Sequence, residues 1–268
     1  MEERRSIWRD VQLPGRARLA GDLRADAAVI GAGMAGLLIA RALTRRGLRV
    51  VVLEAGRIAS GQTKNTTAKI TSQHGMIYDA LLRKFGETAA GQYARANEWA
   101  IQSYAQIIRR EKIDCDFREV SSYLYSKAAK APLEREAEAA RRLGIPALFT
   151  ENTELPFPVK GAVRFDRQAQ FHPLKFIQAI IPELEIYENT PVVRAEGDCL
   201  HTPQGDVRAA NIVFATHYPF VNVPGWFFMR MHQERSYVLA LESDFCPDGQ
   251  YYGVDNDRLS FRTANGLL

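Results

Sequence analysis

Three glycines and one acid have the types and spacing needed to bind a diphosphate and the sugar attached to it. Gly31, Gly33 and Gly36 form a G-x-G-x-x-G sequence, and Glu54 ends the next apolar run. The first glycine allows a tight turn, the second lets a pyrophosphate approach the amides of a helix N-terminus, and the third lets the helix pack closely on a strand. Glu54 can accept hydrogen bonds from an adenosine ribose, and its charge disfavours NADP.

The segments around these residues have the pattern of a βαβ unit. Residues 27–30 and 50–53 are small or apolar and predict two buried strands. Residues 37–43 have helical spacing, and Gly47 is placed to end that helix. A glycine-rich turn alone is also found in structural βαβ units, but here strand, glycines, helix, second strand and acid occur in the required order. We therefore predict dinucleotide binding.

A polar loop follows the acid. Residues 55–71 are rich in small, hydroxyl and basic side chains and cannot form core. Hydroxyls and amides could bind phosphate or ribose there, and lysines could supply positive charge. The alternative is a solvated loop, but its position directly after Glu54 favours ligand contact. The side chains concerned are those of Thr63, Thr66, Thr67, Lys64 and Lys69.

Composition and charge exclude several classes of protein. The 268 residues are 46% hydrophobic and 25% charged, which is typical of a globular protein, and the net charge is only +4. The arginines are spread among acids, so no nucleic-acid partner is expected. Cys115, Cys199 and Cys246 are far apart and predict neither disulfides nor a metal site. No signal peptide and no apolar run of ~20 residues is present, so we expect a cytoplasmic protein without a membrane span.

The remaining chain predicts a second layer interleaved with the first. A helical pattern over residues 76–112 has a break at 85–86, and a charged helix is predicted over 132–143. Residues 211–216 predict a buried strand that ends in Ala-Thr, at the sheet edge where doubly wound folds bind ligands. Further strands are predicted at 122–126, 161–165, 184–187, 192–195, 237–242, 250–254 and 258–262.

The order of the motifs resembles the flavin-dependent oxidoreductases of the D-amino-acid oxidase and glycine oxidase superfamily. More narrowly, it is similar to bacterial members with an appended Rieske [2Fe-2S] domain. The similarity extends over nearly the whole chain. Besides the glycines and Glu54, it is carried by SGQTKNTTAKITSQHG (60–75), FHPLKF (171–176), ENTPVV (188–193) and ANIVFATHYP (210–219).

This resemblance implies an α/β fold with a Rossmann-like FAD-binding domain around a parallel sheet and an interleaved α+β substrate domain with a mostly antiparallel sheet. The expected division is an N-terminal arm (1–25), an FAD-binding domain (26–75 and 145–220) and a substrate domain (76–144 and 221–268). The chain stops where the family has a C-terminal strand and a glycine-rich segment, so we expect truncation, and the Rieske domain is absent.

The resemblance also implies which residues contact FAD. The glycines with the Met34 and Ala35 amides would hold the pyrophosphate, and Glu54 the ribose. The family usually has Gly or Ala after its final Ala-Thr, whereas His217 stands here, so this last contact is a departure from the pattern. The further contacts carried over are those of Ala55, Arg57, Thr63, Thr66, Thr67, Ala68, Val192, Ala215 and Thr216.

The reaction implied is hydride transfer to flavin from a carbon that bears an amine or hydroxyl, in a small amine or amino-acid-like substrate. By position, Lys69 is a candidate cation near the flavin ring and His74 a candidate polar group facing substrate, although a hydrogen-bonded loop histidine is the alternative for His74. The electron acceptor would be oxygen or an iron–sulfur domain. Two other hypotheses are an NAD-dependent dehydrogenase and an inactive dinucleotide-binding module. The long insertion between residues 75 and 190 favours the flavoenzyme over a simple NAD domain.

Overall fold

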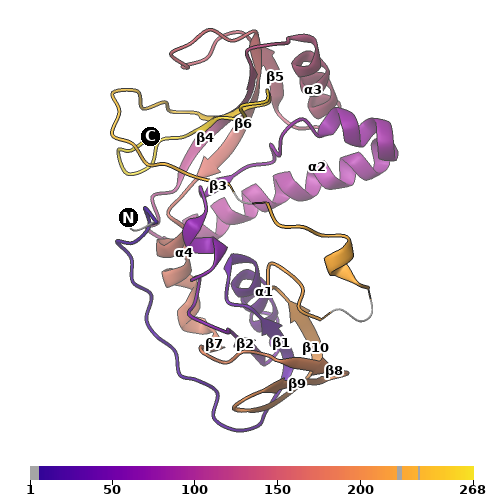
Figure 1. The fold of residues 1–268 in the computed structure, drawn as a ribbon, viewed down its shortest axis with the longest axis vertical. Coiled ribbons are helices and arrows are strands. Elements are labelled where there is room, and N and C mark those ends of the chain that lie inside the picture. The colour runs from indigo at the N-terminus through magenta and orange to yellow at the C-terminus, as the bar shows by residue number, and fades with distance from the viewer. Residues whose placement is uncertain (1–5, 222–224, 235) are drawn as a thin grey trace. The chain divides into compact units, whose positions relative to one another are not determined.

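The computed structural model describes residues 6–221, 225–234 and 236–268, which form two compact units (Figure 1). The first unit is drawn from residues 1–66 and 173–237, and the second from residues 67–172 and 238–268. The chain therefore passes from one unit to the other after residues 66, 172 and 237. Among the described residues, no helix has the length and apolar character needed to cross a bilayer.

A six-stranded sheet forms the centre of the first unit, in the order β7-β2-β1-β10-β9-β8 (Figure 1). The strands β7, β2, β1 and β10 run parallel, and β9 and β8 continue the sheet in antiparallel pairs. In chain order the strands are β1 (Leu23–Ile30), β2 (Val50–Leu53), β7 (Glu185–Tyr187), β8 (Arg194–Glu196), β9 (Cys199–Thr202) and β10 (Gly205–Phe214).

The centre of the parallel sheet forms because the second half of β1 and all of β2 are apolar on both faces. Ala27, Ala28 and Val29 of β1 are fully buried, as are Val51 and Val52 of β2, which is expected of central strands in a parallel sheet. The helix α1 contacts β1 and β2, and α4 contacts α1. The helices of this unit are α1 (Met34–Thr44), α4 (Pro173–Ile180) and the short 3-10 helices η1 (Gln62–Asn65), η2 (Ile181–Glu183) and η3 (Phe227–Met229).

The second unit contains a mixed sheet in the order β12-β11-β4-β6-β3, with β5 also paired to β6. The strands β11 and β4 are parallel, and the other pairs are antiparallel. In chain order the strands are β3 (Lys69–Ile70), β4 (Arg118–Ser126), β5 (Ala147–Thr150), β6 (Gly161–Gln170), β11 (Gln250–Gly253) and β12 (Ser260–Phe261). Its helices are α2 (Tyr78–Glu111) and α3 (Ala131–Arg142).

The helices α2 and α3 share one hydrophobic core with the second sheet. Tyr78 of α2, Leu133 of α3 and Phe165 of β6 are all fully buried in it. The predicted break in α2 is confirmed, since Gly86 has φ of 74° inside the helix. The predicted fold class is confirmed as well, because one unit has a largely parallel sheet and the other a mostly antiparallel one.

The boundaries between the units differ from those predicted. Residues 67–75 and 145–172 were assigned to the FAD-binding domain, but they supply β3, β5 and β6 of the second sheet. The reason is strand pairing over a long sequence separation, because β6 pairs with β4. Residues 221–237, assigned to the substrate domain, fall in the first unit.

Two strand predictions also need correction. Residues 237–242 form no strand, and Leu239 is 77% exposed. In this segment the backbone of Leu241 exchanges hydrogen bonds with that of Leu268, and the sheet of the second unit does not include it. The predicted buried strand at 211–216 is the end of β10, where Phe214 is 46% exposed.

Candidate dinucleotide-binding site

The turn after β1 is closed so tightly that two of its residues must be glycine. Gly31 has φ of 106°, and a Cβ atom there would lie 2.6 Å from the carbonyl oxygen of Ala215. A Cβ atom on Gly36 would lie 2.0 Å from the carbonyl oxygen of Gly31 and 3.2 Å from the Ala215 side chain. Helix α1 therefore sits directly against the ends of β1 and β10, in the way that a G-x-G-x-x-G sequence permits.

The N-terminus of α1 has the features of an anion site. Gly33 is the N-cap in an extended conformation, and the Met34 amide donates a hydrogen bond of 3.0 Å to the Thr63 hydroxyl. The next amides, those of Ala35 and Gly36, have no acceptor inside the helix because the first turn of a helix lacks one. No acidic residue lies in this turn, so the positive end of the helix dipole is not neutralised from within.

Glu54 points back at the glycine turn. One carboxylate oxygen accepts the Ala32 amide at 2.7 Å, and the other accepts the Gly56 amide at 2.8 Å. An ionised carboxylate offers about four acceptor positions, so these two bonds fix its orientation and leave capacity for ribose hydroxyls. The half-buried acid thus lies beside the turn that it was predicted to serve.

A second acid, which was not singled out from the sequence, holds the loop after Glu54. The carboxylate of Glu188 is almost fully buried and accepts the Ile58 amide at 2.7 Å and the Arg16 amide at 3.0 Å. It also pairs with Arg57 at 2.9 Å. Arg57 is predicted to flank the adenosine, and this ion pair orients its exposed guanidinium. The only sequence signal for Glu188 was its place at the start of the ENTPVV motif.

The threonine loop divides between the two units. In the first unit, Thr63 lies in η1 at the mouth of α1, and the carbonyl of Thr66 accepts the indole N–H of the buried Trp8 at 2.9 Å. In the second unit, the carbonyl of Thr67 accepts the guanidinium of Arg262, and Ala68 is buried with φ of 52°. Thr63 is therefore the loop hydroxyl that the first unit places against α1.

The remaining predicted contacts lie at the carboxyl edge of the first sheet and in its core. The Ala215 amide donates to the Ile30 carbonyl at 2.8 Å and so extends β10 past its last residue. The hydroxyl of Thr216 donates to the Tyr218 carbonyl at 2.9 Å. His217, where the motif departs from the family, has φ of 65°. Val192 is half-buried against the first unit's core, and Ala55 is exposed.

Both residues predicted to take part in catalysis belong to the second unit. The ammonium of Lys69 donates to the Ser260 hydroxyl at 2.6 Å. Burial, together with the positive charge of Arg262, lowers the pKa of Lys69 to about 8. The Nδ1 atom of His74 lies 2.8 Å from the Tyr93 hydroxyl, and burial lowers the pKa of this histidine. Their catalytic roles stay predictions.

The glycine turn, the mouth of α1, Glu54 and Thr63 are thus brought together within the first unit. Fold and site together define this unit as an α/β domain with the glycine turn and acid typical of dinucleotide-binding units. Residues 26–265 match the model of the family described as DAO, FAD dependent oxidoreductase, and the chain belongs to this family. The superfamily predicted from the motifs is confirmed.

Three relatives show the range of the similarity. YhfW of Bacillus subtilis, whose name describes a Rieske 2Fe-2S iron-sulfur protein, is 33% identical over 96% of this chain and 53% of its own length. Glycine oxidase from Geobacillus kaustophilus matches with a TM-score of 0.56 and 22% identity, over 72% of this chain and 55% of that one. The L-proline dehydrogenase from P. horikoshii matches with a TM-score of 0.58 and 18% identity, over 74% of this chain and 54% of that one. The chain thus spans about half the length of these relatives.

Proposed function

We propose that the chain binds FAD and oxidises a small amine or amino-acid-like substrate, a CH–NH or CH–OH donor, by hydride transfer to the flavin. The observation that carries the proposal is the paired hydrogen bonding of Glu54 to the Ala32 and Gly56 amides, beside the open first turn of α1. This arrangement presents an acceptor for ribose and donors for a diphosphate side by side.

The groups at the mouth of α1 suit a pyrophosphate chemically, because they are amides and a hydroxyl, with no acidic side chain in the first turn of the helix. A Cβ atom on Gly33 would stand 3.4 Å from the Thr63 hydroxyl, so a side chain here would occupy the space between η1 and the start of α1. The Ala35 amide and the Thr63 hydroxyl supply donors, the Met34 amide would join them in exchange for its bond to Thr63, and Glu54 supplies the ribose acceptor. Arg57, fixed by Glu188, lies on the adjoining loop and would flank the adenosine. The other FAD contacts remain predictions from the family resemblance.

The chemistry divides between cofactor and protein. FAD, when bound, supplies the hydride acceptor. In the protein, Lys69 is proposed as a cation that stabilises negative charge on the acceptor, and His74 as a polar group facing substrate. The lowered pKa of Lys69, about 8, means that this positive charge is present at neutral pH and is lost in mildly alkaline solution.

The names of the relatives support the proposed substrate class and electron acceptor. The names glycine oxidase and L-proline dehydrogenase both describe enzymes that act on amino acids, and this supports an amino-acid-like donor. The name of YhfW supports an iron–sulfur domain as electron acceptor, with oxygen as the alternative.

Flavin absorbance of the purified chain, with and without added FAD, tests this proposal. We expect flavin bands that persist through gel filtration and are weakened in Glu54→Gln, whose FAD affinity should fall about tenfold or more because a charged acceptor is lost. Glu138→Gln, on an exposed face of α3, is the matched control. Protection against unfolding by NADH in place of FAD would instead support a dehydrogenase, and no turnover of any amino acid with FAD bound would support an inactive module.

A further inference from the structure

A polar face on the β8-β9-β10 meander gathers chemically reactive side chains that the proposed flavin site does not use. In the antiparallel register His201 lies opposite both Asp206 and Arg194, and Cys199 lies opposite Glu196. Directly opposed residues point to the same face of a sheet, so these side chains share one face. The intervening Leu200 and Val207 point the other way, into the core of the first unit.

Three of these side chains form a close set of metal-ligand atoms. The Cys199 thiol, a His201 ring nitrogen and an Asp206 carboxylate oxygen all lie within 4.8 Å of one another, and the His201 Nδ1 atom is 2.9 Å from the Asp206 oxygen. Zinc bonds of about 2.0–2.3 Å in a tetrahedron separate neighbouring ligands by roughly 3.3–3.8 Å. To hold an ion, the widest pair of this set must therefore approach and the His201–Asp206 pair must separate slightly.

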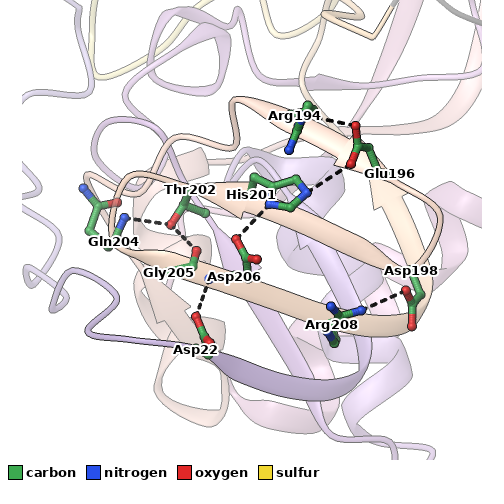
Figure 2. A network of polar contacts seen from close by, with 10 residues as sticks. All are labelled: Asp22, Arg194, Glu196, Asp198, His201, Thr202, Gln204, Gly205, Asp206 and Arg208. Atoms are coloured by element: carbon green, nitrogen blue, oxygen red, sulfur yellow. Dashed lines mark hydrogen bonds and ion pairs between the residues drawn. The ribbon is translucent and has the colours of Figure 1, made fainter.

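The other nitrogen of His201 is held in the way that metal-binding histidines usually are. Its Nε2 atom lies 3.5 Å from a Glu196 oxygen, so His201 stands between Asp206 and Glu196 (Figure 2). A carboxylate on the second ring nitrogen fixes the tautomer and raises the basicity of the ligand. The two arginines on this face are both paired, Arg194 with Glu196 and Arg208 with Asp198, which offsets their repulsion of a cation.

We propose that Cys199, His201 and Asp206 form a zinc site with Glu196 as the positioning residue for His201. A thiolate, an imidazole and a carboxylate are the ligand types that zinc accepts, and a water molecule completes the tetrahedron. On binding, the Cys199 thiol loses its proton to solvent, and metal bonds to His201 Nδ1 and to Asp206 replace the hydrogen bond between them. The neutral ring then carries its proton on Nε2, which faces Glu196. The site joins β9 to β10 and thereby stabilises the meander.

The sequence did not reveal this site because its ligands are not spaced like a zinc motif. Cys199 and His201 alternate on one strand, and Asp206 reaches them only across the hairpin. The interpretation from sequence therefore predicted no metal, and the cross-strand register is what brings the three together.

Calorimetric titration of the untagged, metal-stripped chain with Zn²⁺ tests the proposal. We expect one ion per chain, a rise in the melting temperature, and, with Co²⁺ as the probe, the absorption of a cobalt–thiolate bond. Cys199→Ser should abolish that absorption and weaken Zn²⁺ binding by more than a hundredfold. Cys246→Ser, an exposed cysteine in the second unit, is the matched control and should change neither.

Two further variants separate a metal site from a merely structural cluster. Asp206→Asn, at a half-exposed position, should fold and yet bind Zn²⁺ at least tenfold more weakly. Glu196→Gln should lower the affinity about 10- to 100-fold without loss of the Co²⁺–thiolate band, as removal of an outer-shell partner does. Zinc binding that survives both Cys199→Ser and Asp206→Asn, or no binding by the wild-type chain, would overturn the proposal. Neither result bears on FAD binding.

Discussion

Nearby backbone atoms determine which side chains the glycine turn can accommodate. At Gly36 the nearest atom to an added methyl is a backbone oxygen 2.0 Å away, which cannot move without displacing β1 or α1. A larger residue at such a site is destabilising because the helix and the sheet must separate to make room for it. A larger residue that meets only the flexible end of a side chain has no such effect. The third glycine is therefore required by packing, independently of any ligand.

We expect Gly36→Ala to lower the free energy of unfolding by about 3 kcal/mol and to abolish FAD binding, because α1 must move away from the turn. Chemical denaturation and flavin titration measure the two effects. Gly91→Ala is the matched control, since Gly91 lies inside α2 and a Cβ atom there would meet only the flexible end of the Arg95 side chain. A variant at Gly36 with wild-type stability would show that the turn is looser than described.

The lowered pKa of Lys69 predicts how the stability of the chain depends on pH. Its folded pKa of about 8 lies below the ordinary 10.5, so between these values the unfolded chain holds more protons, and raising the pH through this window adds stability. Lys69→Met removes the half-buried charge. At pH 7 the variant should be about 1 kcal/mol more stable than wild type, since the half-exposed ammonium keeps part of its hydration. The difference should shrink towards pH 10.

Urea denaturation across pH 6–10 measures this difference. Lys64→Met, an exposed lysine five positions earlier, is the control and should show no such pH dependence. If the proposed role near the flavin is also correct, the turnover of wild type should fall as the pH rises through about 8. A constant stability difference between wild type and Lys69→Met at every pH would contradict the lowered pKa.

At the scale of elements, the start of α2 depends on an acid from another helix. Glu136 of α3 is fully buried, and its carboxylate accepts the amides of Ile77, Tyr78 and Asp79 at 2.8–3.0 Å. These are donors that a helix N-terminus cannot satisfy internally. Burial raises the pKa of Glu136 because it disfavours the ionised carboxylate. The hydrogen bonds from the three amides act in the opposite direction and favour the ionised form.

We expect Glu136→Ala to destabilise the chain by about 3 kcal/mol, because one buried and two partly buried amides lose their acceptor. Glu136→Gln, which keeps one oxygen, should lose roughly half as much. Thermal unfolding followed by circular dichroism measures both. Glu138→Ala, an exposed acid two positions along α3, should stay within about 0.5 kcal/mol of wild type. Equal effects of the changes at 136 and 138 would refute the capping role.

The features that could be predicted from the sequence are those that residues close together in the chain encode. The βαβ unit, the kink at Gly86 and the end of α3 before Gly144 are encoded within a few residues, and they were predicted nearly in place. The cap from Glu136 and the buried Glu188 depend on partners more than 50 positions away, which no local pattern reveals. The same reason explains why β6 was assigned to the wrong unit, since only its pairing with β4 places it.

At the scale of the whole molecule, each unit has a hydrophobic core of its own. One is built from residues such as Ile30, Val51 and Val207, and the other from residues such as Tyr78, Leu124 and Phe165. Because the chain passes between the units three times, neither is a continuous segment, and each needs distant parts of the sequence to form. The glycine turn and Glu54 are the proposed cofactor-binding groups with the best-defined contacts, and they all lie in the first unit.

Binding of FAD should therefore stabilise the two units unequally. A ligand present at about 100 times its Kd stabilises the state that binds it by about 2.7 kcal/mol. We expect hydrogen exchange to show a gain of that size for the amides of β1 and β2, and a smaller gain for those of β4 and β6, because the second unit contributes few of the proposed contacts. NADH at the same concentration is the control and should protect neither set. Equal gains in both sheets would mean that the units unfold as one cooperative block, and that the separate cores do not act as separate units of stability.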